Sequence, residues 1–201
     1  MNSLQNTPAG LANPNNKNGG GFGWTRRKLK AINPVSGDNY HKFHEGYDIM
    51  GAIGTPVYAV HSGTVDALID NHPNDVTQWN NIKGIFDYQK YKNWRNTQNP
   101  PLPINAGGNK IKIGWTENGN YYSHNYEHLQ QGTILVSAGD VVTKGQLIGY
   151  IGKTGNAQTN ANGGPHLHFA KYGPNGAIDV GNDIMANYDD NGNDNDPCDN
   201  N

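Results

Sequence analysis

Two histidines lie one residue apart in the segment Gly164 to Phe169, which reads Gly-Pro-His-Leu-His-Phe. In a β-strand, side chains two positions apart point to the same face, so His166 and His168 would project together while Leu167 and Phe169 face the core. Two imidazoles on one rigid support can hold a metal ion or transfer protons. On this segment alone, a pair of solvent-facing histidines remains the alternative.

A second candidate pair is His44 and Asp48, which are separated by four positions with Gly46 midway. An extended chain would place both on one face, with room between them for an ion. Together with His168 they have the composition of a catalytic zinc site, which uses three protein ligands and leaves a fourth position for water. A structural zinc site would close that position, usually with thiolates, and Cys198 is the only cysteine of the chain.

A third histidine region, Tyr122 to Leu129, contains His124 and His128. Both fit a site that needs another imidazole, and their spacing does not choose between them. The remaining histidines of interest lie in turn-like settings and are interpreted as surface residues: His41, His61 and His72.

The segments that must position these side chains are short β-like runs bounded by glycine. The chain has 27 Gly and 11 Pro, which predicts many tight turns, and no segment has the pattern of a long amphipathic helix. The spacing of the runs is typical of a mainly β fold, an antiparallel β-sandwich or open β-barrel. The predicted runs are Pro56–Val60, Gly63–Ile69, Lys110–Trp115, Tyr121–Leu129, Ile134–Val136, Val141–Val142, Gln146–Ile151 and His166–Tyr172.

Composition narrows the classes of partner. A length of 201 residues fits one domain of ordinary size. With 15 basic and 17 acidic residues there is no basic field to bind nucleic acid. No apolar run approaches the roughly 18 residues that span a bilayer, and Met1 to Gly10 has no signal-peptide pattern.

Four segments are expected along the chain: an irregular arm over residues 1–21, a catalytic domain over 22–178, an insert over about 70–108 within it, and an acidic tail over 179–201. The tail is rich in aspartate and has no Lys or Arg, which indicates a solvated tail or a link to a further domain or partner. Its aspartate spacing does not satisfy an EF-hand calcium loop.

The order and spacing of several short motifs resemble the lysostaphin/LytM-type zinc metallopeptidases, a family of peptidoglycan endopeptidases. The resemblance covers about Phe22 to Tyr172, without the insert. The motifs that carry it are Phe22 to Arg26, Asn33 to Gly37, His44-x-x-x-Asp48, Gly54 to Val57, Tyr126 to Leu129, Gly139 to Gln146 and Gly164 to Phe169.

The resemblance implies a β-sandwich or open barrel with a substrate groove, outside the cytoplasm, that hydrolyses peptide bonds in peptidoglycan stems or cross-bridges. It implies one Zn²⁺ per chain, held by His44, Asp48 and His168. It also implies that His128 and His166 are catalytic, which selects His128 over its neighbour His124.

Two alternatives are weighed against this interpretation. A catalytically inactive family member, acting as a cell-wall binding or regulatory module, would be expected to lack one of these five residues. A lipoyl-type carrier barrel would need a lysine at a hairpin tip with a methionine beside it, which Val136 to Ile151 does not offer. We expect four aromatic residues of the insert to line one side of the groove: Trp79, Tyr88, Tyr91 and Trp94. The alternative is that the insert forms a lobe that packs on its own side chains and has no part in function.

Overall fold

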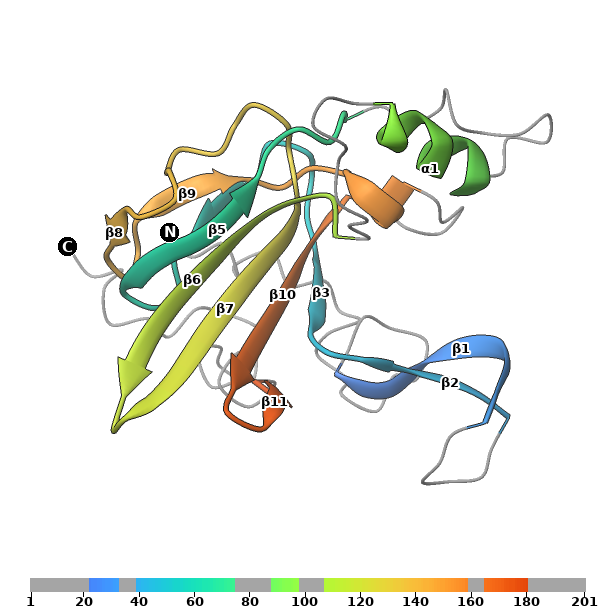
Figure 1. The fold of residues 1–201 in the computed structure, drawn as a ribbon, viewed down its shortest axis with the longest axis horizontal. Helices are drawn as coiled ribbons and strands as arrows, with labels where there is room; N and C mark the ends of the chain where they lie inside the picture. Colours follow the sequence, from blue (N-terminus) through green and yellow to red (C-terminus); the bar gives the residue numbers. More distant parts are fainter. Residues whose placement is uncertain (1–21, 33–38, 75–87, 98–106, 159–164, 181–201) are drawn as a thin grey trace, which may run out of the picture.

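The computed structural model describes residues 22–32, 39–74, 88–97, 107–158 and 165–180 (Figure 1). The expected arm over 1–21 and residues 181–201 of the tail lie outside these ranges. The described elements are β1 Gly23–Ile32, β2 Asn39–His44, β3 Tyr47–Met50, β4 Pro56–Tyr58, β5 Gly63–Ile69, α1 Tyr88–Asn96, β6 Asn109–Glu117, β7 Asn120–Leu129, β8 Val141–Val142, β9 Leu147–Tyr150, β10 His166–Gly173 and β11 Gly176–Ile178, with a 3₁₀ turn over Gly155–Gln158.

A seven-stranded antiparallel sheet forms the centre of the molecule. Its strand order is β11-β10-β7-β6-β5-β8, and β3 pairs with the first half of β10. Strands form here because apolar residues alternate: Ile111 and Ile113 of β6 have no exposed surface, and each lies opposite a buried residue of β7. The predicted antiparallel, mainly β fold is confirmed. Among the described strands the sheet stays open rather than closing into a barrel (Figure 1).

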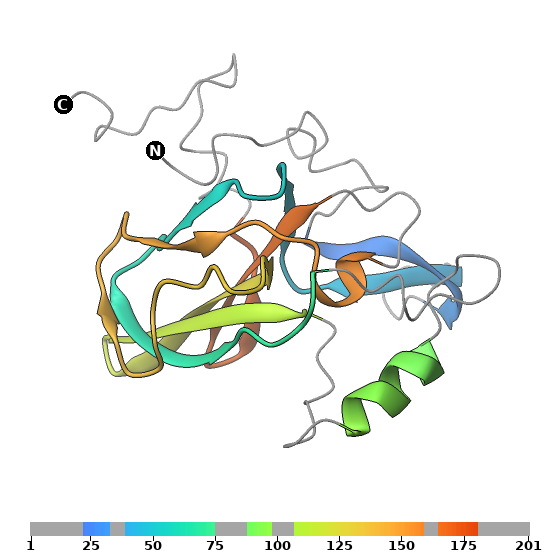
Figure 2. The same cartoon turned by 90° about the horizontal axis from the view of Figure 1, so that it is seen from above.

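The core lies between this sheet and a second, two-stranded sheet of β4 and β9 (Figure 2). Val57 of β4 and Ile148 of β9 have no exposed surface and pack in one cluster with Tyr126 and Phe169 of the large sheet. The Val60 backbone N–H donates to the Tyr126 hydroxyl at 2.8 Å, which satisfies the one polar atom of that buried ring. One face of the large sheet is therefore core, and we call the opposite face, against which no second sheet of the described residues packs, the open face.

The hairpin of β1 and β2 extends away from the large sheet (Figure 1). Before Pro56 the sequence predicted only an extended segment that contains His44 and Asp48, so the hairpin of β1 and β2 and the separate strand β3 correct the expected elements. The sequence of β1, with Arg26, Arg27, Lys28 and Lys30, lacks the apolar alternation that marks a half-buried strand. A two-stranded ribbon beside the main sheet does not need that alternation.

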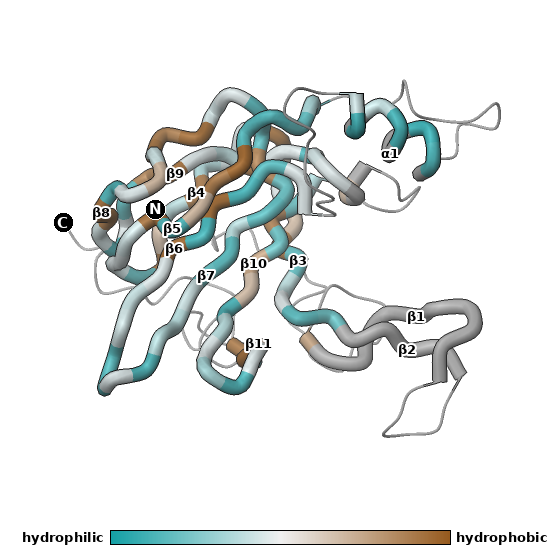
Figure 3. The backbone as a smooth tube through the Cα atoms, in the orientation of Figure 1, coloured by the Kyte–Doolittle hydropathy of each residue, from teal (hydrophilic) through white to brown (hydrophobic). Residues whose placement is uncertain are grey.

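Helix α1 lies in the insert, where the sequence analysis predicted no helix. The helix is short and hydrophilic (Figure 3). Two hydrogen bonds within it are local: Gln89 donates to the side chain of Asn93 one turn later, and the Thr97 hydroxyl donates to the Trp94 carbonyl in the last turn. The expected groove residue Trp79 lies outside the described residues. No helix of the described ranges is long and apolar enough to cross a membrane.

His72, expected at the surface, is instead 1% exposed. Its backbone N–H donates to Asn109 Oδ1 at 2.7 Å and its carbonyl accepts from Asn109 Nδ2 at 2.8 Å. The start of the insert is thus joined to the first residue of β6 by one buried side chain.

His124 predicts how the stability of the fold depends on pH. It lies on the core face among Trp115 and Phe169, and burial, followed by repulsion from Lys171 and His61, lowers its pKa from 6.5 to about 3. Between pH 6.5 and about 3 the unfolded chain binds a proton at this residue and the folded chain does not. The free energy of unfolding therefore falls as the pH drops, by about 1.4 kcal/mol per pH unit at most. We expect His124→Leu to reduce the fall in Tm between pH 7 and 4.5. An unchanged fall would contradict this assignment.

Candidate active site

Three chain segments bring a cluster of polar side chains to the open face of the sheet. His168 lies on β10, directly opposite Asp48 on the neighbouring β3. His44 is the last residue of β2, so His44 and Asp48 lie on either side of a tight turn. The sequence had predicted instead that both residues lie on one extended strand. Only glycine fits in that turn, because a Cβ on Gly46 would lie 2.4 Å from the Phe169 carbonyl oxygen and 3.0 Å from His168 Nε2.

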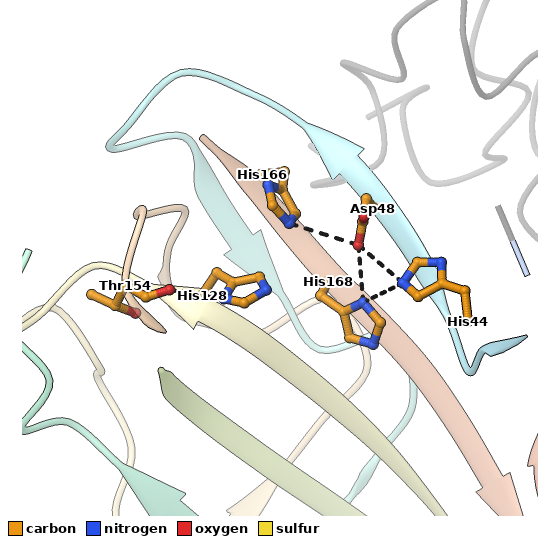
Figure 4. Close-up of polar contacts among 6 residues, drawn as sticks. All are labelled: His44, Asp48, His128, Thr154, His166 and His168. Atoms are coloured by element: carbon orange, nitrogen blue, oxygen red, sulfur yellow. Dashed lines mark hydrogen bonds and ion pairs between the residues drawn. The ribbon is translucent and has the colours of Figure 1, made fainter. Parts of the chain in front are cut away.

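The ligand-type atoms of His44, Asp48 and His168 converge on one point (Figure 4). His168 Nδ1 lies 2.9 Å from both His44 Nε2 and Asp48 Oδ1, and the latter two atoms are 3.2 Å apart. Zinc bonds of about 2.0–2.2 Å in a tetrahedron place ligand atoms roughly 3.3 Å apart. The three atoms therefore form a triangle close to one face of a zinc tetrahedron, and the two-nitrogen, one-oxygen donor set suits this ion.

His166 and His128 lie beside this cluster. His166 Nε2 is 3.7 Å from Asp48 Oδ1, on the same face of β10 as His168. The ring of His128 stands edge-on to that of His166, with 4.7 Å between centroids, and lies 6.2 Å from the ring of His168. The five residues selected from the sequence are thus gathered at one place, whereas His124 lies on the opposite face of β7.

His128 is held in a dry environment. Only 4% of it is exposed, and its Nδ1 lies 2.8 Å from the carbonyl oxygen of Thr154. Burial, followed by repulsion from His166 and His168, lowers its pKa to about 3. The imidazole is therefore neutral near pH 7 and has a nitrogen able to accept a proton.

A polar rim borders the cluster along the sheet. Exposed Glu45 accepts a hydrogen bond from the Tyr172 hydroxyl at 2.8 Å, and Glu127 forms an ion pair of 3.6 Å with Lys110. Burial and then Glu45 raise the pKa of Tyr172. The sequence analysis selected neither Glu45 nor Thr154. No local sequence signal marks Glu45 or Thr154, because their hydrogen-bond partners, Tyr172 and His128, lie far away along the chain and are brought close by the fold.

Comparisons with known proteins find matches to part of this chain. Residues 102–180 match the family described as Peptidase family M23. The chain is 32% identical over 126 residues to Peptidoglycan DD-endopeptidase ShyA of Vibrio cholerae, which covers 63% of this chain and 19% of that protein. It is 30% identical over 128 residues to lysostaphin of Staphylococcus simulans, covering 64% of this chain and 18% of lysostaphin.

Among solved structures, the catalytic domain of lysostaphin from Staphylococcus simulans is 26% identical with a TM-score of 0.48, covering 82% of this chain and 90% of that domain. The chain spans about a fifth of the length of the curated relatives named above. The match therefore concerns one part of those proteins.

Proposed function

We propose that this chain, whose motifs resemble those of the M23 peptidases and whose residues 102–180 match that family, catalyses the zinc-dependent hydrolysis of peptide bonds in bacterial peptidoglycan, in the stem peptide or the cross-bridge. The observation that carries the proposal is the convergence of ligand atoms from His44, Asp48 and His168, all within 4.8 Å of one another. The presence of His128 and His166 beside them favours an active enzyme over an inactive binding module.

Each group has a distinct role in this proposal. One Zn²⁺ per chain, when bound by His44, Asp48 and His168, would supply a water of pKa near 7 and polarise the scissile carbonyl. His128 and His166 are the groups that accept the proton of the attacking water and return one to the leaving amine. Their burial keeps bulk water from competing for those protons.

The substrate class is inferred from the relatives. ShyA is named a peptidoglycan DD-endopeptidase, and lysostaphin matches over a similar length of this chain. Because peptidoglycan lies outside the cytoplasm, we infer that this chain acts there. A partner at the acidic C-terminal end stays a prediction, since residues 181–201 lie outside the described ranges.

Digestion of purified peptidoglycan of several cross-link types, with mass spectrometry of the products, tests the proposal. We expect new amino and carboxyl termini at one kind of peptide bond, and their loss when the metal is chelated. Binding to peptidoglycan without new termini would instead identify an inactive family member that acts as a binding or regulatory module.

The insert is proposed to restrict which peptide enters the site. Three of its four expected wall residues, Tyr88, Tyr91 and Trp94, lie on α1. Deleting residues 76–105, with a short glycine-containing turn in their place, should leave zinc content unchanged but alter the cleavage pattern across peptidoglycan types. The deletion must keep Asp70 and Asn74, whose side chains accept hydrogen bonds from Gly132 and Gln131. Unchanged rates and products would show that the insert has no part in substrate choice.

A further inference from the structure

His128 departs from the regular alternation of β7. Its φ of 66° lies in the left-handed region, which a residue other than glycine rarely adopts. Regular alternation from buried Tyr126 would point His128 toward the core face, whereas its ring contacts His166 on the open face. The backbone conformation therefore delivers this imidazole to the cluster, and something must hold it there.

Two backbone hydrogen bonds hold the strained residue. The His128 N–H donates to the Gly107 carbonyl at 2.7 Å, and the His128 carbonyl accepts from the Gly152 N–H at 3.0 Å. Both partners come from segments outside β7. Such over-determination by surrounding structure is what allows an unfavourable φ to persist.

The ring of His128 is fixed by a third contact. Its Nδ1 lies 2.8 Å from the Thr154 carbonyl oxygen, an atom that can only accept (Figure 4). Nδ1 must therefore carry the proton, and Nε2 is left with its lone pair. A single tautomer is selected, the one whose Nε2 can accept a proton.

Thr154 is itself locked in place. It has no exposed surface; its hydroxyl donates to the Leu129 carbonyl at 2.8 Å and accepts from the Asn109 N–H at 2.9 Å. Asn109 is equally buried and holds His72 by two hydrogen bonds. A Cβ on Gly108, whose φ is +64°, would lie 2.5 Å from the Thr154 hydroxyl oxygen, so the close approach needs glycine.

We infer that Thr154 and Asn109 are positioning residues, which hold His128 in one orientation and one tautomer and couple it to the base of the insert. The inference rests on the proposed function for its effect on rate. The inferred tautomer of His128 is independent of the proposed function, because it follows from the contact with the Thr154 carbonyl oxygen in the folded chain. Thr154 acts through its carbonyl and hydroxyl oxygens, and Asn109 through its backbone N–H and its side-chain clamp on His72.

The first test compares Thr154→Val with Thr154→Ser. Valine has nearly the shape of threonine but neither donates to Leu129 nor accepts from Asn109, whereas serine keeps both bonds. We expect Thr154→Val to lower kcat on a defined peptidoglycan fragment about 10- to 100-fold, with KM and zinc content unchanged, as for groups that orient a reacting side chain. Thr154→Ser should restore kcat to within a few-fold of the original.

Thr133→Val is the matched control. It removes one threonine hydroxyl bond to a backbone carbonyl, that of Gln130 at 2.8 Å, in the loop that follows β7. Its kcat should be unchanged. A Thr154→Val protein with the original kcat would overturn the rate part of the inference, and so would an equal loss in Thr133→Val.

A second measurement needs no activity. ¹⁵N NMR of histidine-labelled full chain distinguishes the two neutral tautomers, and His128 should show a protonated Nδ1. A protonated Nε2 would overturn the inference whether or not the chain cleaves peptidoglycan, and whether or not Thr154→Val folds. Absence of cleavage by the unaltered protein, with the expected tautomer present, would contradict the proposed function alone.

Discussion

Replacing His168 with alanine is expected to lower zinc content from close to one ion per chain to a small fraction of that value and to reduce peptidoglycan hydrolysis to background. His168 Nδ1 is one corner of the ligand triangle, 2.9 Å from the ligand atoms of both His44 and Asp48. Without it two donors remain, one fewer than catalytic zinc sites use. Elemental analysis and the rate on one defined fragment, measured on the same sample, check this result.

His61→Ala is the control for the loss of an imidazole elsewhere. The His61 ring stacks on Trp115, with 4.1 Å between centroids, on the core face and away from the cluster. It should keep its zinc and its rate. Replacing His44 or Asp48 by alanine should repeat the effect of His168→Ala. Full zinc occupancy in the His168→Ala protein would show that the ligand assignment is wrong.

Strands that contribute to the core could be predicted from the sequence, because burial of one face imposes a period of two. The run Lys110–Trp115 was predicted as a strand and lies within β6, Asn109–Glu117. The charged hairpin of β1 and β2 and the polar helix α1 carry no such pattern, so periodicity could not reveal them. The strand pairing of the hairpin and the hydrogen bond between Gln89 and Asn93 of the helix cannot be recognised from composition.

Two features of the site depend on contacts between distant parts of the chain. The burial of His72 requires Asn109, which lies 37 positions later, to satisfy its backbone. His44 and Asp48 converge because a turn at Gly46 passes close to β10, whereas the sequence suggested one extended strand. In both cases the local sequence did not reveal the geometry, because the contacts that fix it join residues far apart along the chain.

The choice between His124 and His128 shows the same limit. The two residues are four positions apart on one strand, so alternation places both on the same face. The backbone φ of 66° at His128 is what places the two side chains on different faces. A histidine at that position does not predict a left-handed conformation. Motif resemblance made the selection that alternation could not.

Alanine at His128 or at His166 is expected to keep the zinc and the fold while lowering turnover by about 10² to 10⁴, the range typical of lost general acid or base catalysis. The ligand triangle contains no nitrogen of His128 or His166, and the rings of both residues lie beside it. His124→Leu, on the core face of the same strand, should retain activity within a few-fold. Zinc content, Tm and kcat of each variant decide the result: loss of zinc in His128→Ala would contradict its assignment as a catalytic residue. An active His128→Ala protein beside a folded but inactive His124→Leu protein would also contradict it, because turnover would then depend on His124, whose ring lies on the core face against Phe169.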